Sequence, residues 1–395
     1  MRQSKLFRIE SLEIKAAWIY FAARLILILS LPLDGIKSYG DLWNFFSQAE
    51  LGLPFLNYWT EFPPIYPWIS RLLYQIAGGS QHRFDYLNIL FFSFLQALNL
   101  FLLLKISDQI GRSQSQKLIG GAVYSGLTIG LFYTWAYFDV IAVAALLASI
   151  YFLFDDKPHK VGILIAGGVL TKWFPLALIP GIWKTKNWRT SLKISITGIG
   201  IVILVWAGLF LINPEMTSAS IQSQAVKGSW ETVWALLDGN LNTGNFPNQV
   251  NRLDPGSINL SSNNPSLIPS WITLIVFGGA GLILLMQSKI NTRKKYLAFS
   301  GLTFVIMFLW SPGYSPQWVQ YLLPIIILAV PSKQSVLFSA ALILINLAEW
   351  PLLLSRGRFE DLYWLILVRT LVLILLGVIF YQQTIEDPAI AGGVD

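Results

Sequence analysis

The chain has 395 residues, of which 54% are hydrophobic and only 12% charged, and its mean hydropathy is +0.57. A soluble domain carries about 25% charged residues, so this composition excludes an ordinary water-soluble enzyme, and the lack of cysteine excludes a disulfide framework and a cysteine metal site. The formal net charge of +7 is typical of a membrane protein whose cytoplasmic loops are basic, and no basic stripe indicates a nucleic-acid partner.

The apolar residues are gathered in blocks close to the length of about 20 residues that a helix needs to cross a bilayer. Backbone polar groups in lipid must be satisfied within the segment, so we predict an all-α, polytopic integral membrane protein with about twelve transmembrane segments. The predicted segments are 16–33, 86–104, 118–134, 139–154, 161–171, 174–183, 194–212, 270–287, 296–310, 317–330, 335–350 and 362–381. The first segment follows a short basic stretch, and it ends without the small residues that mark the cleavage site of a signal peptide. We therefore expect it to be retained as a membrane span.

With the N-terminus placed in the cytoplasm, basic residues fall in loop after loop on the inner side, which also places the C-terminus inside. These residues are Lys105, Arg112, Lys117, Lys157, Lys160, Lys184, Lys186, Arg189, Lys193, Lys289, Arg293, Lys294, Lys295 and Lys333. We therefore expect a multi-pass protein of the cell (plasma) membrane, with 1–395 as a single transmembrane domain. Two long segments, 34–85 and 213–269, are then large extracytoplasmic loops. We expect short amphipathic helices on the membrane surface in the first. The second begins polar, carries the amphipathic stretch 229–237 and ends in a run, 247–269, that indicates a loop.

Two acidic residues of the first loop are candidate catalytic or binding groups. Asp41 follows the first span and lies among aromatic residues, where partial desolvation raises the pKa of a carboxyl and suits it to accept a proton from a hydroxyl. Glu61 precedes Pro63 and Pro64, whose fixed backbone would aim it rigidly. For both, the alternative is a solvated loop acid or, for Asp41, a helix N-cap.

Lys172 falls between two short apolar segments, where Pro175 disfavours a continuous helix. A lysine at such a break can reach a cavity from the outer side and bind a phosphate there. The alternative is a lysine that extends to the interface or marks a short cytoplasmic turn.

The stretch 311–317, Ser-Pro-Gly-Tyr-Ser-Pro-Gln, lies at the outer mouth of two predicted spans. Tyr314 and Gln317 offer hydrogen bonds to a polar ligand, although a plain turn explains the prolines equally well. Arg24 and Arg369 lie inside predicted spans, where they mark either function or pairing with a buried carboxylate. In the last outer loop, Glu349, Arg356 and Arg358 are expected at a solvated rim.

Other site classes are excluded by what the sequence lacks. The two histidines, His82 and His159, fall on opposite sides of the membrane in this topology, so we expect neither a histidine metal cluster nor a catalytic triad. A glycine-rich phosphate loop with its lysine is missing as well, which argues against use of cytoplasmic ATP.

Motifs in the first loop, at the helix break, in the second loop and near residue 315 occur in one characteristic order. They are Asp41 with an aromatic stretch, 52–58 with Gly-Leu-Pro-Phe, 61–67 with Glu-Phe-Pro-Pro-Ile, Lys172-Trp173-Phe174-Pro175, the amphipathic 229–237, and Ser315-Pro316-Gln317-Trp318 followed by Leu323-Pro324. With this topology they resemble the GT-C superfamily of membrane glycosyltransferases, especially the mannosyltransferase-like branch of glycosyltransferase family 87 type.

The resemblance implies transfer of a sugar, mannose first of all, from a polyprenyl-phosphate donor to a lipid or glycan acceptor, with inversion at the anomeric carbon. Asp41 would remove the acceptor proton, while Lys172 and a nearby arginine (Arg252, Arg356 or Arg358) would stabilise the departing lipid phosphate. Several relatives carry an Asp-x-Asp pair that holds a divalent metal, whereas here Tyr39 and Trp43 flank Asp41. We therefore expect no cofactor and a metal-independent transfer.

Two other functions remain open at this stage. A transporter or lipid-linked sugar flippase also needs about a dozen spans and a few charges within them. Against it, such proteins tend to show paired inverted repeats and sites at mid-membrane, whereas the polar residues here concentrate in two unequal loops. A non-catalytic partner subunit is the third possibility.

Overall fold

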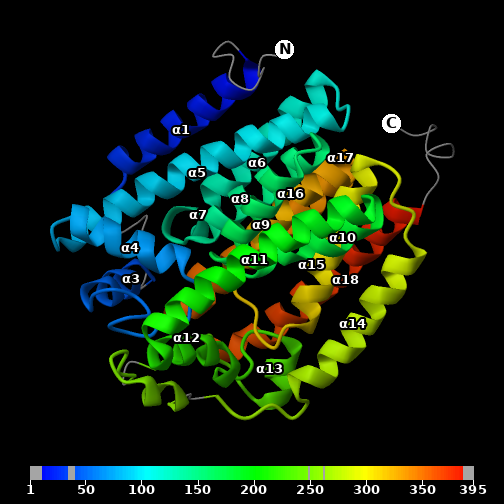
Figure 1. Ribbon diagram of the computed structural model, residues 1–395. Helices are drawn as coiled ribbons and strands as arrows, with labels where there is room; N and C mark the ends of the chain where they lie inside the picture. Colours follow the sequence, from blue (N-terminus) through cyan, green and yellow to red (C-terminus); the bar gives the residue numbers. More distant parts are fainter. Residues whose placement is uncertain (1–10, 34–40, 248–249, 261–262, 386–395) are drawn as a thin grey trace.

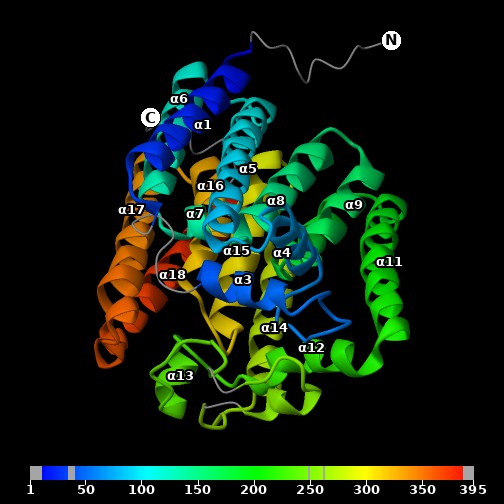
Figure 2. The ribbon, with the colours of Figure 1, turned by 90° about the vertical axis from the view of Figure 1, so that its left-hand side faces the viewer.

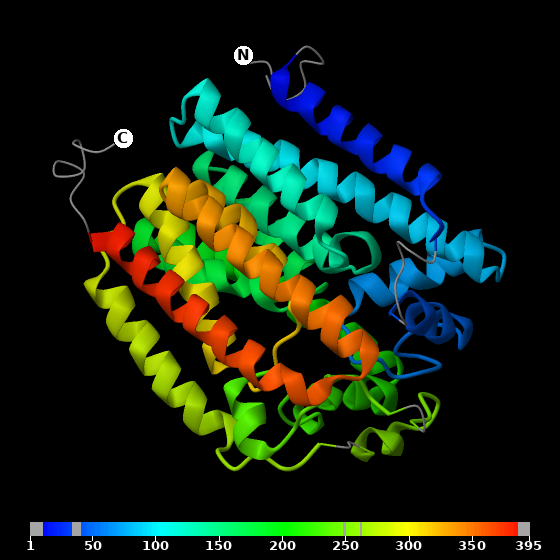
Figure 3. The same cartoon turned by 180° about the vertical axis from the view of Figure 1, so that it is seen from behind.

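The computed structural model describes residues 11–33, 41–247, 250–260 and 263–385. Every regular element among them is a helix, which confirms the all-α prediction, and the long helices run side by side in a single bundle (Figures 1 and 3). Each predicted apolar segment coincides with a helix or with two consecutive short helices. These are α1 (Leu12–Ser30), α5 (Gln81–Gln109), α6 (Gln114–Gly130), α8 (Asp139–Phe154), α9 (Pro158–Val169), η2 (Phe174–Leu178) with α10 (Ile179–Thr185), α11 (Trp188–Ile212), α14 (Ser270–Gln287), α15 (Arg293–Trp310), η4 (Pro316–Trp318) with α16 (Val319–Ala329), α17 (Ser332–Leu347) and α18 (Leu362–Ile385).

Within the described residues, five helical stretches are long and apolar enough to cross a membrane: α5, α11, α14, 332–356 and 359–385. The outward face of α14 shows why lipid is its natural surroundings, since Trp271, Ile275 and Met286 are more than 60% exposed there. A soluble protein does not leave such a continuous apolar face in water. The larger count of about twelve spans stays a prediction, because several of the other helices are shorter than a bilayer requires.

The short helix α16 lies at the centre of the bundle and is buried along its whole length. Its neighbours include α15, α17, α6, α8 and α5, so protein rather than lipid surrounds it. Pro324 lies inside this helix. Helix ends follow local chemistry: Ser113 and Gln116 form a reciprocal capping box at the start of α6.

One end of the bundle carries a layer of shorter elements, opposite the end where α1 begins and α18 stops (Figures 1 and 2). The layer contains most of the described residues of both long segments. Its elements are α3 (Asp41–Glu50), α4 (Ile65–Ile76), α12 (Pro214–Val226), α13 (Val233–Asp238) and η3 (Pro255–Asn259). We call it the end layer.

Two parts of the end layer differ from expectation. Helix α12 forms where the sequence indicated only a polar start, because Asn213 caps it and Pro214 occupies its first turn. The amphipathic stretch 229–237 yields only the six-residue α13, which ends at Gly239 in the left-handed region. Before it, the Trp230 ring lies so close to Gly244 and Gly313 that a Cβ at either glycine would clash with it.

Candidate active site

A cavity of about 410 Å³ lies where the end layer meets the long helices. Of the candidate residues from the sequence, Asp41, Glu61, Lys172 and Gln317 line it, although they come from three separate parts of the chain: the first long segment, the helix break and the stretch 311–317. Tyr314, Arg356 and Arg358 do not line it. Packing of segments that are far apart in the sequence therefore assembles the site.

Asp41 is the first residue of α3 and keeps part of its surface accessible. Desolvation raises the pKa of Asp41 to about 7, repulsion from Asp139 adds to the rise, and the positive charge of Lys172 opposes it. A carboxylate with this pKa accepts a proton from a hydroxyl far more readily than an ordinary aspartate does. The expected chemistry of Asp41 thus has a structural basis.

Lys172 lies at the break between α9 and η2, and its Nζ is 3.4 Å from Oδ2 of Asp139. The rings of Phe138 and Tyr137 lie 5.0 and 5.3 Å from the ammonium group. Asp139 is fully buried at the start of α8 and was not singled out in the sequence. An acidic residue at the edge of an apolar block is typical of the end of a membrane span. The sequence therefore did not indicate that Asp139 is the counter-ion of Lys172.

Glu61 forms a two-pronged ion pair with Arg252, whose two terminal nitrogens each donate to one carboxylate oxygen. Burial opposes ionisation of Glu61, but the charges of Arg252 and Lys227 and the hydrogen bond from Arg252 hold its pKa at about 2. Arg252 also covers the ring of Trp59 at 4.2 Å. This pair, which we call the loop clasp, joins the first long segment to the second.

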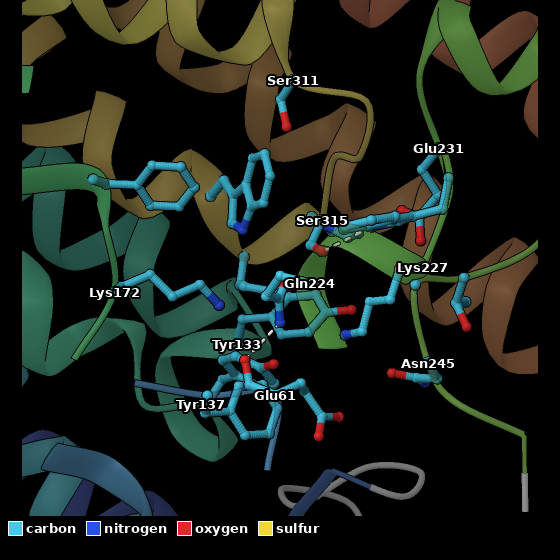
Figure 4. Close-up of a pocket in the computed structure, with 18 of the residues that line it drawn as sticks. Glu61, Tyr133, Tyr137, Lys172, Gln224, Lys227, Glu231, Asn245, Ser311 and Ser315 are labelled. Atoms are coloured by element: carbon cyan, nitrogen blue, oxygen red, sulfur yellow. Dashed lines mark hydrogen bonds between the residues drawn. The ribbon is translucent and has the colours of Figure 1, made fainter. Parts of the chain in front are cut away.

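Lys227 is a cavity residue that sequence reasoning missed, because a single lysine in a polar loop carries no signal. Its ammonium group points into the cavity from the side opposite Lys172 (Figure 4). Burial lowers the pKa of Lys227 to about 8, with Glu61 opposing the fall and Arg252 and Lys172 adding to it. Two cations thus face one space.

Tyr314 is buried beside the cavity rather than in its wall. Its backbone N–H donates to the carbonyl of Trp230 at 3.0 Å, and its ring is covered by the guanidinium of Arg369 at 3.8 Å. Gln317, by contrast, is 6% exposed and lines the cavity. The 311–317 stretch is therefore a loop that holds the second long segment and presents one amide to the site.

The remaining arginines have structural surroundings. Arg24 donates to Ser93 and to the carbonyl of Thr134 in the core. Arg369 pairs with Glu349, which is buried rather than at a solvated rim as expected. Arg358 is exposed and pairs with Asp361 at 2.7 Å, and Arg356 is also exposed.

The described part of the chain contains no group of three or more His, Asp or Glu residues arranged to hold a metal ion. Glu61 in the cavity wall is paired with Arg252, and Asp139 behind the wall is paired with Lys172. Metal independence remains a prediction for experiment.

No protein-family model matches the sequence, and no curated protein matches it. A search of solved structures finds the crystal structure of the Archaeoglobus fulgidus oligosaccharyltransferase in complex with Zn and sulfate, at 12% identity and a TM-score of 0.38. The match covers 95% of this chain and 53% of that one, so the chain spans about half the length of that enzyme. A TM-score this low does not establish a shared fold, and the resemblance to the GT-C superfamily stays a prediction.

Proposed function

We propose that this protein is a membrane glycosyltransferase of the GT-C type, which transfers a sugar from a polyprenyl-phosphate donor to a lipid or glycan acceptor on the extracytoplasmic face. Mannose is the first donor sugar to test. One observation carries the proposal: a single cavity beside apolar helices holds a carboxyl with a pKa near 7 and two lysines. Base and cations are the two kinds of group that transfer from a lipid phosphate requires.

In the proposed reaction, Asp41 takes the proton of an acceptor hydroxyl as its oxygen attacks the anomeric carbon. The bond between that carbon and the phosphate oxygen breaks, and the lipid phosphate leaves with the bonding electrons. Attack from the face opposite the leaving group inverts the anomeric carbon. The presence of Asp41 in the cavity wall supports this role.

The lysines would stabilise the charge that develops on the departing phosphate. Lys172 and Lys227 approach the cavity from opposite sides (Figure 4), so a phosphate in the cavity would lie between two positive charges. Such preorganised cations contribute more in a water-poor site than they would in water. Asp139 balances Lys172 and keeps it in place before the donor binds.

The rest of the lining suits a sugar. Neutral amide and hydroxyl groups come from Asn44, Gln224, Asn245, Ser311 and Gln317. Hydroxyl-rich ligands are recognised by such donors and acceptors, and the apolar spans beside the cavity offer surroundings for a polyprenyl chain.

A transporter or flippase is less well supported. The cavity lies at one end of the bundle beside the end layer, whereas transporter sites lie near mid-membrane between repeats. The end layer also supplies Asp41, whose raised pKa suits it to take a proton from an acceptor hydroxyl.

The test uses purified protein in detergent with radiolabelled polyprenyl-phosphate mannose, glucose or arabinose and a panel of lipid and glycan acceptors, each with and without a chelator. We expect labelled product from one donor, equal in amount with and without chelator. Failure of all donors with every acceptor would overturn the proposal, and loss with chelator alone would overturn metal independence.

A further inference from the structure

Glu231 is held in the cavity wall in a conformation that glutamate rarely adopts. Its φ is 52°, in the left-handed region, and Phe55 and Asp156 are the only other non-glycine residues with positive φ among those described. Backbone strain of this kind persists where the surroundings over-determine it, and it is concentrated at functional sites. Glu231 lines the cavity in this conformation, next to Trp230.

The side chain of Glu231 is buried with unused hydrogen-bonding capacity. Glu231 is 3% exposed, and its Oε2 has no hydrogen-bond partner among the described residues. Buried polar atoms in proteins are nearly always hydrogen-bonded, so an exception that lines a cavity points to a ligand. Glu231 lies on the same side of the cavity as Lys227 and Asn245, across from Lys172 (Figure 4).

The residues around Glu231 fix its position rigidly. Its backbone carbonyl accepts a hydrogen bond from Arg369, which also pairs with Glu349. On one side the N–H of Trp230 donates to the carbonyl of Pro312 at 3.2 Å, and on the other the hydroxyl of Thr232 donates to the same carbonyl at 2.8 Å. These bonds hold the backbone of Glu231 in place beside the cavity.

Electrostatics then decides what kind of group Glu231 would bind. Burial raises the pKa of Glu231 well above its ordinary value, nearby Glu349 raises it further, and Arg369 opposes the rise. A carboxyl accepts a hydrogen bond from a sugar hydroxyl in either protonation state, and it also donates one when it carries its proton. An ionised carboxyl repels an anionic phosphate, so a sugar hydroxyl is the better match for Glu231.

Building on the proposed transfer reaction, we propose that Glu231 is the specificity-determining residue that binds one ring hydroxyl of the donor sugar through its buried carboxyl. A site built to bind a hydroxyl strongly rejects an analogue that lacks it, because the buried polar group is then left unpaired. The enzyme should therefore discriminate against one particular deoxy sugar, and Glu231 should be the source of that discrimination.

The experiment compares kcat/KM for the transferred sugar with kcat/KM for its deoxy analogues, each missing one hydroxyl, in wild type and variants. For wild type we expect one analogue to be worse by at least about 100-fold. In Glu231→Ala we expect kcat/KM to fall for the full donor and to change little for that analogue, so most of the discrimination is lost. Glu231→Gln has an amide that also donates and accepts hydrogen bonds, so its kcat/KM for the full donor should stay within about tenfold of wild type. Glu215→Ala, which removes an exposed glutamate, is the control and should match wild type in kcat/KM.

Folding is followed by the melting temperature in detergent. If Glu231→Ala does not fold, Glu231→Asn withdraws the polar group by one methylene, and the same loss of discrimination is expected. Equal losses on every donor, with the ratio unchanged, would overturn the role of Glu231 and leave the transferase intact. A wild-type protein that transfers no sugar would overturn the proposed function and this inference together.

Discussion

The pKa values of two carboxyl groups in the same cavity are shifted in opposite directions by their neighbours. Glu61, bonded on both oxygens by Arg252, has a pKa of about 2 and stays ionised at any working pH. Asp41, desolvated and close to Asp139, has a pKa of about 7. Pairs of acids whose pKa values are separated in this way point to different roles, which supports Asp41 rather than Glu61 as the proposed base.

The pKa of Asp41 sets a pH dependence of activity. A general base works only when ionised, so kcat/KM should rise about tenfold per pH unit below about 7 and level off above it. Since folding raises this pKa above its ordinary 3.8, ionised Asp41 destabilises the fold as pH rises from about 4 to 7. Asp41→Asn should therefore melt no lower than wild type at pH 7.5. A pH profile of kcat/KM that is flat between pH 5.5 and 8 would contradict the assignment of Asp41.

Lys172 should matter for both catalysis and stability. Lys172→Ala should lower kcat/KM by roughly 100- to 1,000-fold, as removal of a group that stabilises developing charge does. It should also destabilise the protein by roughly 3–5 kcal/mol, because Asp139 is left buried without its cation. Adding Asp139→Asn should restore the melting temperature without restoring transfer, whereas Lys333→Ala on the exposed surface should change neither. Restored transfer in the double variant would exclude Lys172 from catalysis.

Residue types and local motifs predicted part of the site. Asp41, Glu61, Lys172 and Gln317 stood out because each interrupts an apolar or proline-rich context, and the structure brings all four together. Lys227 and Glu231 had no such signal, since their importance comes from packing between segments distant in sequence. Arg358 lies near an outer loop, yet its exposed pair with Asp361 keeps it apart from the cavity.

At the scale of elements, hydrophobic blocks predicted the positions of the long helices well, because burial in lipid or protein requires continuous apolar runs. Helix α12 was missed since its residues are mostly polar, and it is stabilised by contacts that the sequence does not reveal. Ser220 on this helix accepts a hydrogen bond from the N–H of Thr60 at 3.1 Å, and Gln224 donates to the carbonyl of Glu61 at 2.6 Å.

The loop clasp should hold the end layer together. Arg252→Ala leaves Glu61 buried without its partner, so we expect a loss of roughly 3–5 kcal/mol in stability and faster proteolysis within 213–269. Arg358→Ala removes the exposed pair with Asp361 and should cost less than about 1 kcal/mol. Because the pKa of Glu61 is depressed from 4.5 to about 2, the clasp should hold above pH 4.5 and weaken only as the pH falls towards 2. Equal protease sensitivity of the two variants would show that the clasp does not hold the layer.

At the scale of the whole molecule, the two long segments meet at the end of the bundle opposite the start of α1 and the end of α18 (Figure 1). This arrangement agrees with basic residues gathered on one side and the polar loops on the other. The orientation in the membrane itself remains a prediction, because it depends on the basic loops rather than on the fold.

The absence of cysteine from the sequence allows a direct test of orientation. His82 and His159 are both exposed, at the starts of α5 and α9. In intact cells, a membrane-impermeant maleimide should label His82→Cys at once and His159→Cys only after the membrane is permeabilised. The cysteine-free wild type is the matched blank. The reverse pattern would place the cavity on the cytoplasmic side and contradict the proposed topology.

If the cavity transfers a sugar with Asp41 as its base, donor binding and turnover should respond differently to Asp41→Asn. We expect Asp41→Asn to bind the polyprenyl-phosphate sugar within a few-fold of wild type, because Lys172 and Lys227 are intact, while kcat falls by about 100-fold or more. Asp155→Asn, which alters an exposed aspartate, should leave both unchanged. Undiminished turnover by a folded Asp41→Asn protein would contradict the claim.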